Sequence, residues 1–165
     1  MSNKKFRDLT LFIVDIFVAV QKINEYVKSF GNENEFRHSS LHWDATIRQL
    51  EIIGEALNNL LDDEGFHSLS PKYFRKIVNF RNTISHGYFG INIDEVWNVI
   101  HQHLDILISD LKIITSKNTL DLKAAIKSSI NEYTSLDDQL TIKYLEQLLA
   151  SYENFKKHHL DEASE

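Results

Sequence analysis

The chain has 165 residues, and 42% of them are hydrophobic, which is enough to build the core of one ordinary domain. Glycine (5 residues) and proline (1 residue) are too scarce for an all-β protein or for disordered linkers, both of which need many turn residues. The absence of cysteine excludes disulfides, thiolate metal sites and cysteine nucleophiles, and the net charge of −6 argues against non-specific coating of nucleic acid.

The most apolar early stretch, residues 11–20, is too short to cross a bilayer and carries Asp15 in its middle. A secretory signal would not contain this acid and then continue into further helix. We therefore expect a cytoplasmic protein with no membrane partner.

Apolar residues recur at spacings of three and four along residues 1–116, which predicts a core of four helices. Capping residues mark their starts: a pair of serines before the second, Ser70-Pro71 at the third and Asn92 at the fourth. Gly54 stands within the apolar stripe of the second helix, so we expect another helix to approach it closely. The four helices are predicted at residues 4–29, 41–61, 71–85 and 93–116.

The character of the sequence changes after Lys117. Residues 119–131 can form a short helix, and Ser135 followed by Asp138 can cap a last helix. We therefore divide the chain into a four-helix core at residues 1–116 and a helical appendage at residues 117–165.

The segment from Gly65 to Ile93 contains no acidic residue, although the chain as a whole is acidic. Its four positive charges come from Lys72, Arg75, Lys76 and Arg81. Such a segment is a candidate contact for an anionic ligand, and the first three of these residues can contact an RNA backbone. The alternative, which charge alone does not separate from it, is a basic helix face that balances acidic neighbours.

The third helix ends in the one segment with a chemical signature, Arg81-Asn82-Thr83-Ile84-Ser85-His86-Gly87-Tyr88. Histidine is the usual general acid or base at neutral pH, and arginine stabilises charge that develops on phosphate. Together they can cleave RNA without a metal: the ribose 2′-OH attacks phosphorus, His86 moves the protons, and Arg81 stabilises the pentacoordinate phosphorus. Asn82 can orient His86 or bind a phosphate oxygen.

The spacing of Arg81 and His86 limits how this chemistry can be assembled. An offset of five residues on a continuous helix places the two about 140° apart. They converge only if the helix ends between them or if two copies of the motif meet. On spacing alone we favour a simpler interpretation, in which His86 interacts with the dipole at a helix end and Arg81 caps carbonyl groups.

A resemblance to a known family favours the catalytic interpretation instead. The pattern Arg81-Asn82-x-x-x-His86-Gly87-Tyr88 is similar to the Arg-x4-His-x-Tyr signature of the HEPN superfamily, specifically its HepT toxin branch. The helix with Asp15, the stretch at residues 48–56 and the helix with Trp97 also resemble that family in order and spacing. The resemblance covers residues 5–115 and leaves residues 117–165 without a counterpart.

The resemblance implies an antiparallel four-helix bundle and a homodimer in which the motifs of both chains face one cleft. It implies a metal-independent endoribonuclease without a cofactor, with Arg81, Asn82 and His86 as catalytic residues. The protein would be the growth-arresting toxin of a type VII-like toxin–antitoxin pair. Its partner would be a cognate minimal nucleotidyltransferase that transfers AMP onto Tyr88, and the added bulk and negative charge would block RNA.

Further charged residues allow two interpretations. Four of them lie near one face of the second helix: Asp44, Arg48, Glu51 and Glu55. They can hold the motif arginine or histidine in place, or they can form ordinary ion pairs. We favour ordinary pairs for Asp44 and Glu55, and we leave both interpretations open for Arg48 and Glu51.

The spacings of the histidines are not typical of a metal site, and we expect none. Trp43 and Trp97 stand within apolar stripes, so we expect them to pack in the core or at a dimer interface rather than to stack on bases. Two rival hypotheses concern the whole chain. One is a non-catalytic substrate- or nucleotide-binding subunit of a nucleotidyltransferase complex, against which the intact motif argues. The other is a purely structural helical bundle.

Overall fold

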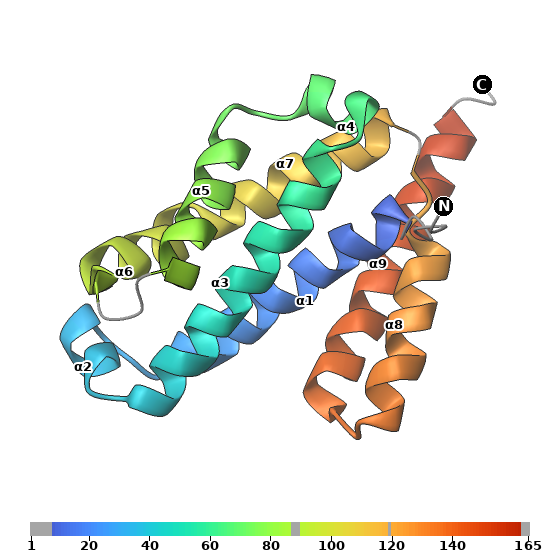
Figure 1. The fold of residues 1–165 in the computed structure, drawn as a ribbon. Coiled ribbons are helices and arrows are strands. Elements are labelled where there is room, and N and C mark those ends of the chain that lie inside the picture. The colour runs from blue at the N-terminus through green and yellow to red at the C-terminus, as the bar shows by residue number, and fades with distance from the viewer. Residues whose placement is uncertain (1–7, 87–89, 119, 163–165) are drawn as a thin grey trace, which may run out of the picture. The chain divides into compact units, whose positions relative to one another are not determined.

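The computed structural model describes the backbone of residues 8–86, 90–118 and 120–162, and their side chains except those of residues 85, 86 and 155–162. These described residues form nine α-helices and no strand (Figure 1), which confirms the predicted all-α fold class. The helices fall into two compact units, Met1–Leu120 and Asp121–Glu165. No helix within the described part of the chain is long and apolar enough to span a bilayer.

The first unit is built around α1 (Leu9–Val27) and α3 (Ser40–Leu61), which pack against each other. Next to α3 lies α5 (Tyr73–His86), and α6 (Ile93–Gln102) leads into α7 (Leu104–Lys117). Successive long helices of this unit alternate in direction (Figure 1), so the predicted antiparallel bundle is confirmed.

The core of this unit consists of the apolar faces that the periodicity predicted. Its fully buried aliphatic side chains come mainly from α1, α3 and α7: Ile13, Ile16, Ile23, Ile53, Leu57, Leu60, Leu104 and Leu107. Each such burial contributes about 1.5–3 kcal/mol to the free energy of unfolding. The core therefore fixes α3, against which the motif helix α5 packs.

Two short helices, α2 (Glu33–Arg37) and α4 (Glu64–Leu69), were not predicted. Asn32 caps α2 by accepting a hydrogen bond from the Glu35 amide at 3.0 Å, and Asp63 caps α4 by accepting one from the Phe66 amide at 2.8 Å. A helix of five or six residues is too short to show a hydrophobic period, so only its cap is visible in the sequence.

The aromatic ring of Phe36, from α2, is fully buried between the two tryptophans of the chain. Its centroid lies 5.7 Å from that of Trp43 and 5.7 Å from that of Trp97. Both distances are typical of packed aromatic pairs. Both tryptophans therefore pack on a core residue, while they themselves are half-buried.

The helix predicted at residues 93–116 was wrong as a single element, because it is broken at His103 into α6 and α7. Asn92 caps α6 as predicted, and its side chain accepts a hydrogen bond from the Asp94 amide at 2.9 Å. His103 departs from helical geometry with φ −118°. The buried residues Ile100 and Leu104 keep helical spacing across the break, so the apolar period gave no sign of it.

The second unit pairs α8 (Lys123–Ser135) with α9 (Gln139–Glu162). The cap of α9 is Asp138, which accepts hydrogen bonds from the Thr141 amide at 3.1 Å and from its hydroxyl at 2.8 Å. The Ser135 hydroxyl instead donates to a carbonyl of α8. The division of the chain into separate domains after residue 116 stays a prediction.

Candidate functional site

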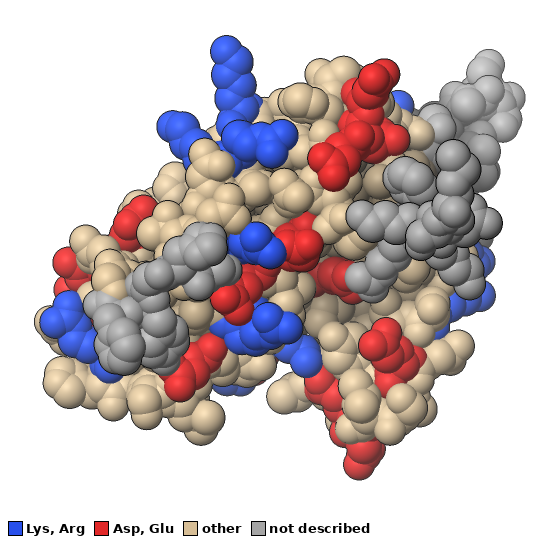
Figure 2. All heavy atoms as spheres, in the orientation of Figure 1, with Lys and Arg blue, Asp and Glu red and all other residues tan. Residues whose placement is uncertain are grey.

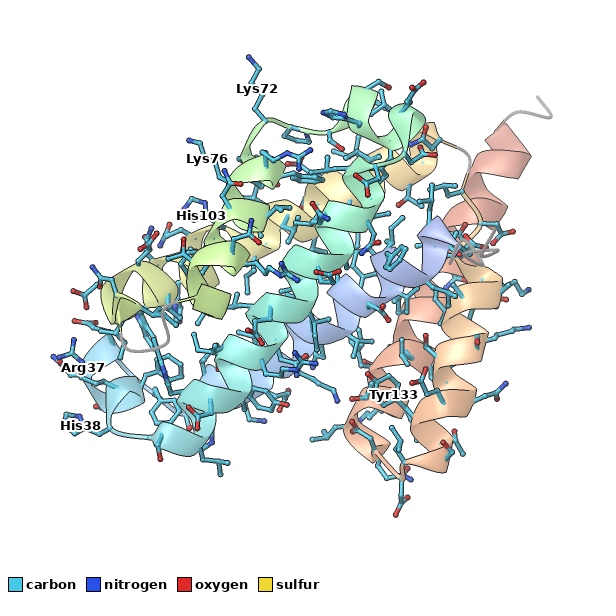
Figure 3. All side chains as sticks on the ribbon, viewed as in Figure 1. Arg37, His38, Lys72, Lys76, His103 and Tyr133 are labelled. Carbon is cyan, nitrogen blue, oxygen red and sulfur yellow. The ribbon has the colours of Figure 1, made fainter. Side chains whose placement is uncertain are left out.

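The helix that carries the motif, α5, has two different faces. Phe74, Val78 and Ile84 are buried in the bundle. The opposite face is exposed and consists of basic and polar residues: Arg75, Lys76, Asn79, Asn82 and Thr83. Lys72, just before the helix, is exposed as well. Lys72 and Lys76 project away from the ribbon in Figure 3, and basic side chains stand over α5 near the top of Figure 2.

Tyr73 ties the first turn of α5 to α7. Its hydroxyl donates a hydrogen bond to the Asp110 carboxylate, with an O···O distance of 2.7 Å. Burial, followed by the hydrogen bond to Asp110 and the charge of Asp110, raises the pKa of Tyr73 above its usual value, so the hydroxyl remains a donor at neutral pH. Sequence patterns gave no signal for this contact between residues 37 positions apart.

The helices α3 and α5 approach each other closely at Gly54 and Arg81. A Cβ atom on residue 54 would lie 2.3 Å from Cβ and 2.7 Å from Cγ of Arg81. Such separations are far shorter than van der Waals contact, so Arg81 fits here only because residue 54 is glycine. The prediction that Gly54 admits another helix is confirmed, and the helix that it admits carries the motif arginine.

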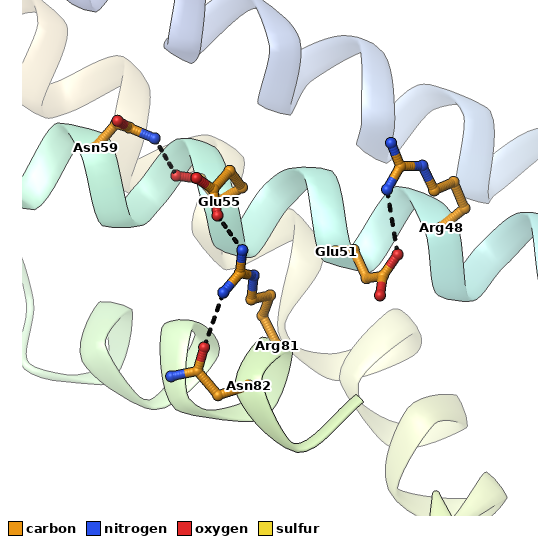
Figure 4. A network of polar contacts seen from close by, with 6 residues as sticks. All are labelled: Arg48, Glu51, Glu55, Asn59, Arg81 and Asn82. Atoms are coloured by element: carbon orange, nitrogen blue, oxygen red, sulfur yellow. Dashed lines mark hydrogen bonds and ion pairs between the residues drawn. The ribbon is translucent and has the colours of Figure 1, made fainter. Parts of the chain in front are cut away.

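Both terminal nitrogens of the Arg81 guanidinium are engaged (Figure 4). Nη2 donates to the Glu55 carboxylate of α3 in an ion pair, and Nη1 donates to Oδ1 of Asn82 at 3.0 Å. The Asn59 amide donates to the Glu55 backbone carbonyl at 2.8 Å. Arginine has five N–H donors, and the Arg81 side chain is 35% exposed, so the guanidinium retains donors for an anion from solvent.

The remaining motif residues lie mostly outside the described part of the chain. His86 is the last residue of α5, but its side chain and the whole of Gly87 and Tyr88 are not described. Because α5 runs unbroken from Arg81 to His86, the helix does not end between them, and their positions on it are about 140° apart. The structure therefore does not follow the first of the two routes to convergence, in which the helix ends between Arg81 and His86.

The described contacts of the charged residues on α3 are ion pairs. Glu55 pairs with the motif arginine of α5, a contact that agrees both with an ordinary ion pair between helices and with a residue that holds Arg81. One turn earlier, Arg48 and Glu51 form a pair within α3, with Nη1 and Oε2 3.3 Å apart. Asp44 is exposed. Sequence spacing predicts which charged residues share a face of a helix, but it does not predict which of them contacts a residue on another helix.

Two of the described histidines contact a carbonyl oxygen four residues earlier in the chain. Nδ1 of His101 lies 2.9 Å from the Trp97 carbonyl oxygen, and Nδ1 of His38 lies 2.7 Å from the Asn34 carbonyl oxygen. Among the residues that the structure describes, no cluster of three or more histidine or acidic side chains is arranged to hold a metal ion.

The described helices agree with the all-α fold of the HEPN superfamily. The model of the family described as "Ribonuclease HepT-like" matches residues 16–117, well over half of the chain. The chain belongs to this family. The match ends with α7, so α8 and α9 lie beyond it.

Individual relatives support the same assignment. The chain is 30% identical over 109 residues to "Putative RNase MJ1380" of Methanocaldococcus jannaschii, a match that covers 66% of this chain and 97% of that protein. It is 30% identical over 97 residues to "Probable ribonuclease HepT" of Thermococcus cleftensis, a match that covers 58% of this chain and 86% of that protein. A third relative, "Gamma-glutamylcyclotransferase and putative RNase MJ0434" of M. jannaschii, is matched over only 43% of its length. No solved structure is significantly similar to the chain.

Proposed function

We propose that this protein is a metal-independent endoribonuclease that acts as a growth-arresting toxin. The observation that carries the proposal is the Arg81 guanidinium, which Glu55 and Asn82 hold at the surface of the helix that ends at His86. Family membership and the printed names of the relatives support RNA as the substrate.

The proposed reaction needs one proton acceptor, one proton donor and a cation for the phosphate. A His86 imidazole removes the proton of the ribose 2′-OH, whose oxygen attacks the adjacent phosphorus. Arg81 stabilises the charge of the pentacoordinate phosphate, with Asn82 as a further polar contact. A protonated imidazole then returns a proton to the departing 5′ oxygen. The products are a 2′,3′-cyclic phosphate and a free 5′-hydroxyl, and no metal takes part.

The site is proposed to form between two chains. In one chain, Arg81 and His86 occupy positions about 140° apart on α5. A two-fold symmetric pair of α5 helices brings each arginine towards the histidine of the other chain, because a two-fold interface presents the same surface twice. The homodimer therefore supplies the convergence that the single helix lacks.

The basic residues at the start of α5 are proposed to hold the RNA backbone. Replacing Lys72, Arg75 and Lys76 together with alanine should weaken RNA binding and lower the slope of log affinity against log salt by up to about 2, at ~0.7 per lost contact with a single strand. Fluorescence anisotropy with RNA in a His86→Ala background measures this without cleavage.

A charge-matched control for that experiment replaces Arg37, Lys112 and Lys117, which are exposed on other helices. If the control lowers the salt slope as much as the α5 variant does, the acid-free face of α5 has no special role in binding RNA.

The partner is proposed to be a minimal nucleotidyltransferase that transfers AMP from a nucleoside triphosphate to the Tyr88 hydroxyl, releasing pyrophosphate. Co-expression with this partner should increase the intact mass by whole AMP units and abolish RNA cleavage, since bulk and negative charge would then occupy the site. Intact-protein mass spectrometry measures the gain. Tyr88→Phe should show no gain and should remain active; an equal gain in that variant would place the modification elsewhere.

The proposed activity is tested with the purified chain alone. The wild-type protein should cleave single-stranded RNA in excess EDTA, and its products should carry 2′,3′-cyclic phosphate ends. A protein that forms a stable complex with a nucleotidyltransferase but cleaves no RNA, with or without divalent cations, would instead be a non-catalytic binding subunit.

A further inference from the structure

We propose that Glu55 is a positioning residue that fixes the orientation of the Arg81 guanidinium in the site. The inference rests on the proposed ribonuclease function and deepens it. Glu55 touches no reacting atom in the proposed reaction, so it would act through Arg81 alone.

Two consecutive residues of α3 act on the two ends of the Arg81 side chain. Gly54 leaves room for Cβ and Cγ of Arg81, which lie too close to residue 54 for any residue that has a Cβ. Glu55 binds Nη2 at the far end, while Asn82 accepts from Nη1 (Figure 4). A long arginine side chain otherwise samples many rotamers. Held at its stem and at both terminal nitrogens, it can present its remaining donors to phosphate without reorganising.

Because Glu55 is negatively charged, a positioning role and a simple effect on RNA affinity predict different changes in kcat and KM when Glu55 is removed. A carboxylate beside a phosphate-binding arginine repels RNA and takes up one of the donors of Arg81. If Arg81 only increased affinity for RNA, removing this acid would strengthen binding and leave turnover unchanged. If Glu55 positions Arg81, removing it lowers kcat while KM stays the same or falls.

The structure supplies a matched control in Glu25 of α1, which forms an ion pair with Lys28. The Glu25 side chain is 29% exposed and that of Glu55 is 54% exposed, so losing Glu25 should disturb the fold at least as much. Ion pairs this exposed contribute little to stability, so both alanine variants should melt within about 2 °C of the wild type.

The test compares cleavage by the full-length wild-type protein with Glu55→Ala, Glu55→Gln and Glu25→Ala. Glu55→Ala should lower kcat by about 10–100-fold, because small displacements of a catalytic group have effects of that size. Glu55→Gln keeps an acceptor for Nη2 but no charge, so its kcat should lie between those of the alanine variant and the wild type. Glu25→Ala should stay within about 2-fold of the wild type. Equal kcat values for Glu55→Ala and Glu25→Ala would overturn the proposal.

A second readout separates this proposal from the ribonuclease function itself. Side-chain NMR of ¹⁵N-arginine, with Arg81 assigned by comparison with Arg81→Lys, reports the guanidinium directly. Slow rotation in the wild type and averaged signals in Glu55→Ala support positioning, even if the wild type proves unable to cleave RNA. Arg81 signals that are the same in both proteins overturn the proposal, even if the wild type is an active ribonuclease.

Discussion

Replacing His86 with alanine should lower the rate of RNA cleavage by about 10²–10⁴-fold, because the reaction then lacks its general base and acid. Arg81→Ala should lower the rate by about 10²–10³-fold, the usual effect of removing one group that stabilises developing charge. Single-turnover cleavage of end-labelled RNA in EDTA measures both effects. Arg81→Ala should keep its fold, since Arg81 is partly exposed and its ion pair with Glu55 lies at the surface.

Two control variants test whether the loss of cleavage is specific to His86 and to the guanidinium group of Arg81. His38→Ala removes an exposed histidine that follows α2 and contacts the Asn34 carbonyl oxygen, and it should cleave like the wild type. Arg81→Lys keeps the charge without the planar fork, so it should recover only part of the activity. If His86→Ala cleaves RNA as fast as the wild type, the proposed chemistry is wrong, whatever the other variants do.

Replacing Gly54 with alanine should both destabilise the bundle and impair cleavage. The new Cβ would lie 2.3 Å from Cβ of Arg81, an atom fixed to the backbone of α5, so the two helices must move apart. Overpacking of this kind costs about 1–3 kcal/mol. The preference of alanine over glycine in a helix offsets about 1 kcal/mol of it. Thermal or urea unfolding should show the net loss, and cleavage should fall at least about tenfold as Arg81 is displaced.

The double variant Gly54→Ala/Arg81→Gly identifies the cause of the destabilisation, because it removes the Cβ that the new methyl group meets. It should be more stable than the sum of the two single effects by about 1 kcal/mol or more. Gly31→Ala is the control for glycine replacement as such, since the atoms nearest its new Cβ would belong to the Glu35 carboxylate, at 3.4 Å or more. Additive effects of Gly54→Ala and Arg81→Gly would contradict the close contact between α3 and α5.

The long helices were predictable because their apolar periods are long. The period extends over about five turns in α1 and about six turns in α3. The fully buried Phe36 and Phe66 lie on helices of five and six residues, where no period can develop. The helix break at His103 cannot be detected in the apolar pattern either, since Ile100 and Leu104 keep helical spacing across it. Boundaries that depend on backbone geometry rather than on burial leave no trace in the pattern of residues.

The candidate site was predictable in its residue types but not in its contacts. The motif marked Arg81, and the glycine in an apolar stripe marked Gly54 as a point of close approach. That these two positions meet is a fact about how α3 packs on α5, which no local pattern contains. The choice between Glu51 and Glu55 as partner of the arginine likewise depends on the rotation of α3 about its axis. The predicted roles of His86 and Tyr88 concern side chains outside the described residues.

The most direct test of this account is the activity of a heterodimer that joins an Arg81→Ala chain to a His86→Ala chain. Differently tagged chains, refolded together and purified through both tags, give this species alone. If the site forms between two chains, the heterodimer keeps one arginine and one histidine that face each other, and it should cleave RNA at a substantial fraction of the wild-type rate in EDTA. A heterodimer as inactive as its two parent homodimers would contradict the account.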